Sequence, residues 1–354
     1  MDRRTALQSL LSVGAYFAAP KLTYGTEDQI TDYGARPSPR PYISKAPRFY
    51  DRFAPFKGIS TLGRNVFLYQ NLQREIGEII PHYQGPAPDG SPGEGDCVGQ
   101  ATAMGCDVLA ASDIHLLKQS EEWKAKASVE MIYAGSRIEI GQTESGTNHL
   151  RGRGGSHGGW AARYVRDYGV LHRLKYQKDG NAIDLEGYHP DRSRQYRDQG
   201  VPDWLEAIAR EHPVKEITNV RSGKEALDAV CSGQPVVICS SYAFPPVRDS
   251  DGFTTPYLGT TYKRGWKVFS ARVQWWHAMV LTAAILEGGR IGGTIQNSHG
   301  PWNEGPRPNN MPEGSFNVEI QYLDLMVQDW YDCWALGSYE GHKSKKIRHK
   351  LYLR

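Results

Sequence analysis

The chain lacks the features that mark several large classes of protein. Its 354 residues include only five cysteines, and no two are spaced as Cys-x-x-Cys, so nothing indicates a zinc site. No segment approaches the roughly 20 apolar residues that a membrane-spanning helix needs. The formal net charge of +3 is too small to indicate a nucleic-acid partner for the whole chain. We find no internal repeat, and the length allows a large two-lobed globular domain.

The two ends of the chain differ from its body. Residues 1–20 combine a basic start with an apolar stretch, which is typical of a twin-arginine export signal or of an amphipathic first helix. An export signal would place the protein in the periplasm or outside the cell, and otherwise it is expected in the cytoplasm. Residues 21–72 begin rich in Pro, Tyr and Arg and predict an extended arm, which could be a spacer, a pro-segment or an arm docked on the body. The basic tail, 339–354, could contact an anionic surface or simply be solvated.

The apolar pattern predicts an α+β protein with a mostly helical first half and a mostly β second half. The polar stretch over 175–202 is expected to be a loop. Helices are expected at 97–117, 120–133, 160–168, 203–211 and 223–231, and strands at 235–239, 278–285 and 293–296.

Cys97 stands where a thiol can become reactive. It follows a Gly/Pro-rich loop and opens the 97–117 helix, with Asp96 placed to cap that helix. Backbone N–H groups and the helix dipole at this position stabilise a thiolate. The loop predicts that Cys97 is exposed, so we interpret it as a nucleophile rather than as a buried inert cysteine. Cys106 would face the other side of the helix and belong to the core.

His277 and Asn297 supply what such a thiol needs. His277 follows two tryptophans at the start of an apolar strand, and Asn297 follows the next strand. Two adjacent antiparallel strands would bring the Asn297 amide to the His277 ring. A histidine in this position is often structural, but with Cys97 and Asn297 it completes a set of nucleophile, base and orienting group.

In this order the segments resemble those of the papain-like (C1-type) cysteine peptidases. The similarity covers roughly residues 84–305, and its markers are Gln84-Gly85, Cys97, Gly154 to Gly159 before Trp160, His277-Ala278, and Asn297-Ser298-His299-Gly300. The resemblance implies a papain-like two-lobed α+β fold over 73–338. The helical lobe, about 84–215, would carry the nucleophile, and the antiparallel β-rich lobe, about 216–338, would carry the histidine and the asparagine.

The resemblance also implies a role for each residue. Cys97 would be the nucleophile, His277 the general base and then general acid, and Asn297 the residue that orients His277. Gln84 would hold the oxyanion together with the Cys97 backbone N–H. Gln84 lies further before Cys97 than is usual in the family, so Gln100 is a competing candidate.

Substrate would lie in a cleft between the lobes. Glycines in the cleft wall let a peptide backbone approach closely, because they carry no Cβ. Nearby arginines leave an RNA contact or a plain loop as alternatives for this segment. The predicted substrate-binding residues are Gly154, Gly155, Ser156, His157 and Trp276.

The implied function is that of a cysteine-type peptidase, hydrolysing peptide or related amide bonds through a thioester acyl-enzyme, with no metal or organic cofactor. Three residues depart from the family pattern. Glu94 stands where the family has a cysteine that forms a disulfide, Val98 stands in place of an aromatic residue, and His299 stands in place of a tryptophan. These departures leave open a non-catalytic papain-fold protein that binds a peptide or polymer in the same cleft. The export-like start and the basic tail favour, as a third interpretation, an amidase or endopeptidase acting on cell-wall peptides.

Overall fold

The computed structural model describes residues 29–39, 43, 45–53, 65–77, 82–84, 94–117, 123–143, 150–263, 266–271 and 273–339. The predicted export signal, most of the loop that precedes Cys97 and the tail from residue 340 lie outside the described residues. All five cysteines are within them, are buried and form no disulfide with one another. Among the described helices, none is both long enough and apolar enough to cross a membrane.

In the described part of the chain, most helices lie in the first two thirds and most of the long strands in the last third. Its helices are α2 (Phe49–Arg52), α4 (Tyr69–Ile76), α5 (Cys97–Leu117), α6 (Val129–Gly135), the π-helix η1 (Ser136–Gln142), α8 (Gly158–Asp167), α9 (Pro190–Tyr196), α10 (Asp203–Ala209), α11 (Gly223–Cys231), the 3₁₀-helix η2 (Pro308–Asn310) and α12 (Ile320–Trp330). Its strands are β1 (Gln29–Asp32), β2 (Ala35–Arg36), β3 (Val66–Phe67), β4 (Ser156–His157), β5 (Lys175–Lys178), β6 (Asn181–Asp184), β7 (Val214–Asn219), β8 (Val236–Tyr242), β9 (Leu258–Lys263), β10 (Trp266–Ala271), β11 (Val273–Glu287), β12 (Arg290–Gln296), β13 (Phe316–Glu319) and β14 (Asp332–Tyr339).

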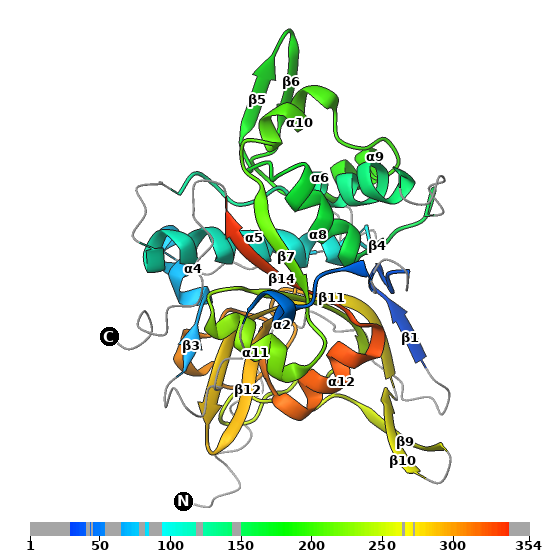
Figure 1. Ribbon diagram of the computed structural model, residues 1–354, viewed down its shortest axis with the longest axis vertical. Coiled ribbons are helices and arrows are strands. Elements are labelled where there is room, and N and C mark those ends of the chain that lie inside the picture. Colours follow the sequence, from blue (N-terminus) through cyan, green and yellow to red (C-terminus); the bar gives the residue numbers. More distant parts are fainter. Residues whose placement is uncertain are drawn as a thin grey trace, which may run out of the picture.

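Helices and the main sheet occupy different parts of the molecule. Figure 1 shows α6, α9, α10 and the β5–β6 hairpin in the upper part, and β11, β12, α11 and α12 in the lower part. The main sheet runs in the order β13-β12-β11-β8-β14-β7, with β1 and β3 also paired to β11. Each part has its own buried cluster, one containing Ile238, Val280 and Leu323, and the other Val98, Ile132 and Trp160. The predicted α+β class is confirmed.

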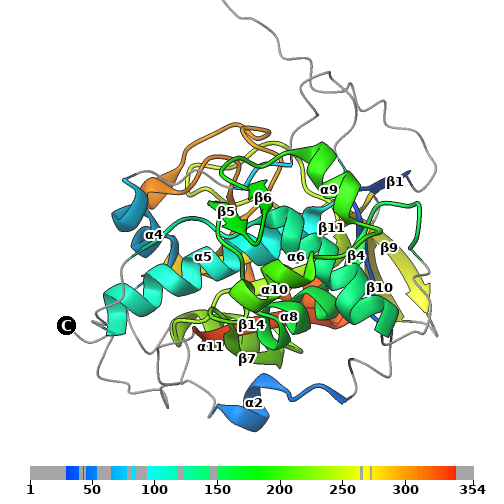
Figure 2. The same ribbon diagram turned by 90° about the horizontal axis from the view of Figure 1, so that it is seen from above.

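Helix α5 passes through the middle of the structure (Figure 2) and has the predicted bounds. It contacts α4, α6 and α8 as well as strands β8, β11 and β14. Small residues let these elements approach. A Cβ on Gly105 would lie 2.9 Å from the Cδ1 atom of Leu336 on β14. Because this helix is buried on nearly all sides, its first residue is fixed between the two clusters.

Two sequence predictions are wrong. Residues 175–202 are not a loop, because β5 and β6 form a hairpin and α9 follows it. The turn residues, Asp179 and Gly180, both have positive φ, and Asp-Gly is a strong hairpin signal. The helix expected over 120–133 begins only at Val129, because the backbone before it is held extended. There Ala127 forms a β-bridge with His172 and donates its N–H to Asp107.

Candidate active site

Cys97 is the first residue of α5, and the carboxylate before it ties this end of the helix to the helical lobe. Asp96 is fully buried, and its Oδ2 accepts hydrogen bonds from the hydroxyls of Tyr188 (2.9 Å) and Ser193 (2.7 Å). Its Oδ1 accepts a bond of 3.3 Å from Gln100 Nε2. Burial raises the pKa of Asp96 to about 6, against the effect of these donors. The start of α5 is therefore held by side-chain contacts as well as by packing.

The expected exposure of Cys97 is wrong, since the residue is 0% exposed. Cys97 belongs to the same buried cluster as Ala35, Cys239 and Ala278. Ala35 comes from the N-terminal region, so this cluster joins segments that are far apart in the sequence. Sequence proximity to a Gly/Pro loop could not reveal this tertiary packing.

His277 lies inside β11 rather than at its start, because the strand begins at Val273. The pairing of β11 with β8 shifts by one residue between Gln274 and His277. Such a bulge bends a strand locally and redirects the side chains that follow it. It lies immediately before His277, and so helps to set the direction of the imidazole.

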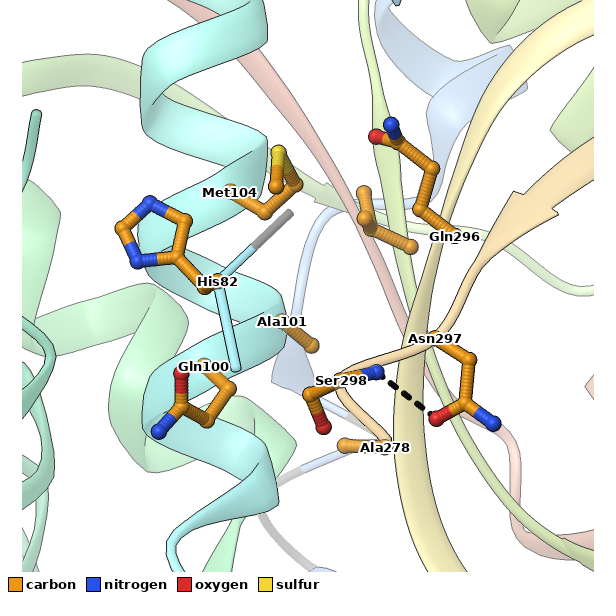
Figure 3. A pocket seen from close by; sticks show the side chains of 9 residues that line it. His82, Gln100, Ala101, Met104, Ala278, Gln296, Asn297 and Ser298 are labelled. Atoms are coloured by element: carbon orange, nitrogen blue, oxygen red, sulfur yellow. Dashed lines mark hydrogen bonds between the residues drawn. The ribbon is translucent and has the colours of Figure 1, made fainter. Parts of the chain in front are cut away.

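The structure brings His277 and Asn297 together as predicted. Strands β11 and β12 are antiparallel neighbours, and Asn297 is the first residue after β12. The His277 Nε2 atom donates to Asn297 Oδ1 over 2.7 Å, and both residues are buried. The backbone N–H of Ser298 donates to the same Oδ1, also over 2.7 Å, as the dashed line in Figure 3 shows. Figure 3 also shows that a small cavity separates this strand end from Ala101 on α5.

The environment of His277 favours a neutral ring. Burial lowers its pKa to about 4, and the hydrogen bond to Asn297 opposes this shift. Within the described structure its other ring nitrogen, Nδ1, makes no hydrogen bond. Nδ1 is therefore the nitrogen open to a further group.

A shell of rings surrounds this pair. His299 stacks on His277, with ring centroids 4.4 Å apart and an interplanar angle of 23°. Tyr33 packs against both histidines, at 5.0 Å from His277 and 4.2 Å from His299. Trp275 and Trp302 complete the shell around His299. The position where the family has a tryptophan thus carries a titratable ring in direct contact with His277.

Of the two candidate oxyanion residues, Gln84 lies beside the pair and Gln100 faces Asp96. The backbone N–H of Gln84 donates to the Ser298 carbonyl over 2.7 Å. Its side-chain Nε2 donates to the backbone carbonyl of Tyr33 over 3.2 Å. Gln84 Nε2 therefore already donates to a peptide carbonyl next to the His277–Asn297 pair.

All five predicted substrate-binding residues contact the chain's own residues 33–36, which we call the arm segment. The Ser156 N–H donates to the Gly34 carbonyl over 2.8 Å, and β4 pairs with β2 of the arm segment. His157 Nδ1 lies 3.1 Å from the Arg36 carbonyl, to which it can donate. On the opposite wall, the Tyr33 N–H donates to the Trp276 carbonyl over 3.2 Å. The Arg36 guanidinium lies over the Trp276 ring at 5.4 Å.

Glycines allow this close approach. A Cβ on Gly155 would lie 2.6 Å from the Gly34 carbonyl oxygen, and one on Gly34 would lie 1.7 Å from the Gly95 oxygen. Gly154 faces the Glu94 backbone, where a Cβ would lie 2.8 Å from its oxygen. The predicted reason for the glycines, backbone approach by a peptide, is therefore met by the arm segment.

A buried carboxylate holds the next part of the arm. Asp332 Oδ2 accepts from the Ser38 hydroxyl over 2.8 Å and from the Ser38 N–H over 3.2 Å. The N–H groups of Gly158 and Gly159, at the start of α8, also donate to Asp332. Neither Ser38 nor Asp332 belongs to a recognisable sequence motif, and neither was predicted to be part of the site.

We expect the arm segment to loosen as the pH falls from 6.5 towards 4. Burial under the arm lowers the pKa of His277 from 6.5 to about 4, and its release would return the ring to water. The open form then binds protons more tightly than the covered form. The covered form is fully favoured above pH 6.5 and loses stability through this window, by up to roughly tenfold in its equilibrium constant per pH unit.

Hydrogen exchange of a peptide containing residues 33–36, corrected for intrinsic rates, measures this effect. The matched reference is a peptide from the β5–β6 hairpin, which lies in the upper part of the molecule (Figure 1). Constant protection of the arm segment between pH 6.5 and pH 4 would contradict the expectation.

One of three comparisons with known proteins found similar proteins, and it concerns the fold. No protein-family model matches the chain, and no curated protein matches it. Among solved structures, xylellain, a cysteine protease from Xylella fastidiosa, aligns with a TM-score of 0.50 and 17% identity, over 89% of this chain and 98% of that one. Digestive procathepsin L 3 of Tenebrio molitor aligns with a TM-score of 0.44 and 14% identity, over 83% and 76%. Procathepsin B S9 from Trypanosoma congolense aligns with a TM-score of 0.43 and 10% identity, over 82% and 83%. The chain has the two-lobed fold of the papain-like cysteine proteases.

Proposed function

We propose that the protein is a cysteine-type peptidase whose own arm segment occupies its substrate cleft. One observation carries the proposal: a peptide segment, residues 33–36, is hydrogen-bonded through its backbone to both walls of the site, and its Tyr33 ring packs against His277. A site that binds peptide backbone at a base is suited to peptide hydrolysis.

In the proposed reaction, His277 Nδ1 takes the Cys97 proton and the thiolate attacks the carbonyl carbon of the scissile bond. The start of α5 stabilises the thiolate, because the N–H groups in the first turn of a helix favour negative charge there. The oxyanion that forms is held by the Cys97 N–H and the Gln84 amide. His277 then gives its proton to the departing amine, leaving a thioester that water hydrolyses to release the acid and restore the thiol.

The contact between Gln84 and Tyr33 supports this choice of oxyanion donor. Gln84 Nε2 binds the Tyr33 carbonyl, whereas Gln100 Nε2 binds a carboxylate. We therefore assign the oxyanion to Gln84 and give Gln100 the role of holding Asp96. The substrate is a peptide or protein. Export and the preference for cell-wall peptides concern the ends of the chain and stay predictions.

Thiol labelling tests the proposal. We expect an epoxide or iodoacetamide probe to modify Cys97 near neutral pH faster than the other four cysteines, at a rate that rises when the arm segment leaves the cleft empty. A His277→Gln variant should lose this selectivity, because no base remains to form the thiolate. Peptide mapping after labelling reports each cysteine separately. If Cys97 reacts only as slowly as a buried ordinary thiol in the open form, the protein is a peptide-binding module instead.

A further inference from the structure

The stacked histidine, His299, makes a contact that a tryptophan at this position could not make. Its Nδ1 lies 3.3 Å from the Nδ2 atom of Asn297. His299 lies three residues after Gln296, the last residue of β12, which pairs with Val280 of β11, and its ring stacks on that of His277. His299 therefore touches both members of the His277–Asn297 pair.

Hydrogen-bond chemistry fixes the direction of the Asn297 amide. Its Oδ1 accepts from the Ser298 backbone N–H, which can only donate, and from His277 Nε2. Turning the amide over would place its NH₂ group against the Ser298 N–H. Nδ2 therefore points the other way, towards His299 Nδ1. Since Nδ2 only donates, His299 Nδ1 must accept, and the proton of the neutral ring lies on Nε2.

The same logic sets the proton position on His277. Its Nε2 faces an acceptor and must carry a proton, so in the neutral ring Nδ1 holds the lone pair. This is the arrangement that a base for Cys97 requires. A proton on His299 Nδ1 would face the Asn297 NH₂ group, and if Nε2 kept its proton as well, a positive ring would lie 4.4 Å from His277.

The surroundings keep His299 neutral. Its Nε2 atom is buried and makes no hydrogen bond within the described part of the chain. The titratable side chains packed against it are His277 of β11 and Tyr33 of the arm, and Trp275 and Trp302 are its other ring neighbours. Burial first, and the charge of His277 second, hold the pKa of His299 well below its usual range. A buried N–H without an acceptor, such as the one on His299 Nε2, is unfavourable. If His299 only filled space, an apolar ring would therefore be more stable at this position.

We propose that His299 is a positioning residue that locks the Asn297 amide, and through it the tautomer of His277, by accepting a hydrogen bond at Nδ1. The inference rests on the proposed function, because it gives the pair a role in peptide hydrolysis. It requires His299 to stay neutral while His277 gains and loses a proton.

Nitrogen NMR of the full-length Cys97→Ala protein tests the lock without any activity. At neutral pH we expect the His299 Nε2 to be protonated and its Nδ1 to be unprotonated, with the same tautomer for His277. In His299→Phe the ring stack remains but the acceptor is gone, which leaves only the Ser298 N–H to oppose a turned Asn297 amide, and the His277 tautomers should become mixed. A His299 that is protonated at Nδ1 at neutral pH, or a His277 spectrum unchanged in His299→Phe, would overturn the proposal.

Kinetics of the full-length chain provide the second measurement. His299→Phe should lower kcat by roughly tenfold, the effect of one lost hydrogen bond to the orienting amide, with little change in KM. His299→Gln offers a neutral acceptor and should restore most of kcat. Because glutamine does not titrate, the acid side of the pH profile of kcat should lose the effect of protonating His299. The control is His212→Phe, which removes a histidine packed on another histidine, His172, away from this site.

The outcomes separate the two proposals. If His299→Phe keeps the wild-type kcat and pH profile while Cys97→Ala is inactive, His299 only fills space and the peptidase proposal stands. If the chain hydrolyses no peptide even when the arm segment has been displaced, the peptidase proposal fails, and the NMR result still decides whether His299 sets the tautomer.

Discussion

Replacing Gly34 with valine is expected to expel the arm segment and to expose Cys97 in the full-length chain. Gly34 has φ +107°, and a Cβ there would lie 1.7 Å from the backbone oxygen of Gly95. A side chain cannot fit unless the arm moves. Overpacking and an unfavourable φ each cost about 1–3 kcal/mol, so a total of about 3 kcal/mol is reasonable. Since about 1.4 kcal/mol is tenfold, the alkylation rate of Cys97 should rise by about a hundredfold.

The matched control is Gly180→Val. Gly180 has φ +80°, but no atom lies within 4 Å of the point that a Cβ would occupy there, so the substitution brings the backbone strain without the clash. Gly180 lies in the turn between β5 and β6, and its replacement should leave the labelling of Cys97 unchanged. Hydrogen exchange of residues 33–36 shows whether the arm has left. If Gly34→Val frees the arm but the chain neither labels at Cys97 nor cleaves peptides, the arm contact is right and the peptidase proposal is wrong.

Removing Cys97 or His277 is expected to reduce peptide hydrolysis by about 10⁴-fold or more, as for other nucleophile–base pairs. The two residues would act as one unit, since neither can attack a carbonyl without the other. The Cys97→Ala/His277→Ala double variant should therefore be no worse than either single variant. Measurement of kcat/KM in the Gly34→Val background avoids masking by the arm.

The control for Cys97→Ala is Cys106→Ala. Both cysteines are buried on α5, but Cys106 lies in the core, where burial raises the pKa of its thiol well above the usual range. Cys106→Ala should lower stability slightly and leave kcat unchanged. Peptide hydrolysis that survives in Cys97→Ala would show that another group attacks the substrate.

The sequence was sufficient to predict the order of the candidate site residues and the helix and strands that hold them. It did not predict that the arm segment lies in the site. Cys97, His277 and Asn297 stand at the start of a helix, within a strand and after the next strand, and these are local signals that apolar periodicity reveals. The contact of Tyr33 with His277 joins residues far apart in the chain, and no local pattern encodes it. The stacking of His299 on His277 depends on the register between β11 and β12, which periodicity does not specify.

One wrong prediction, the loop over 175–202, concerned a segment whose sequence does contain the signal for the observed hairpin. The hairpin over 175–184 carries an Asp-Gly turn between two short strands, but its strands are exposed and polar, so they show no apolar alternation. The burial of Cys97 had no such signal. It results from packing among residues that are far apart in the sequence, because the buried cluster of Cys97 also contains Ala35, Cys239 and Ala278.

The arm segment belongs to the same polypeptide as the walls that hold it, and this changes how its contacts should be counted. A tethered segment meets its site at an effective concentration that is often millimolar, whatever the concentration of the protein. A few hydrogen bonds and ring contacts, which would give weak binding between separate molecules, can then keep the site filled. Dilution would not empty it, whereas a single cut in the chain between the arm and α4 would turn the same contacts into those of a peptide that diffuses away.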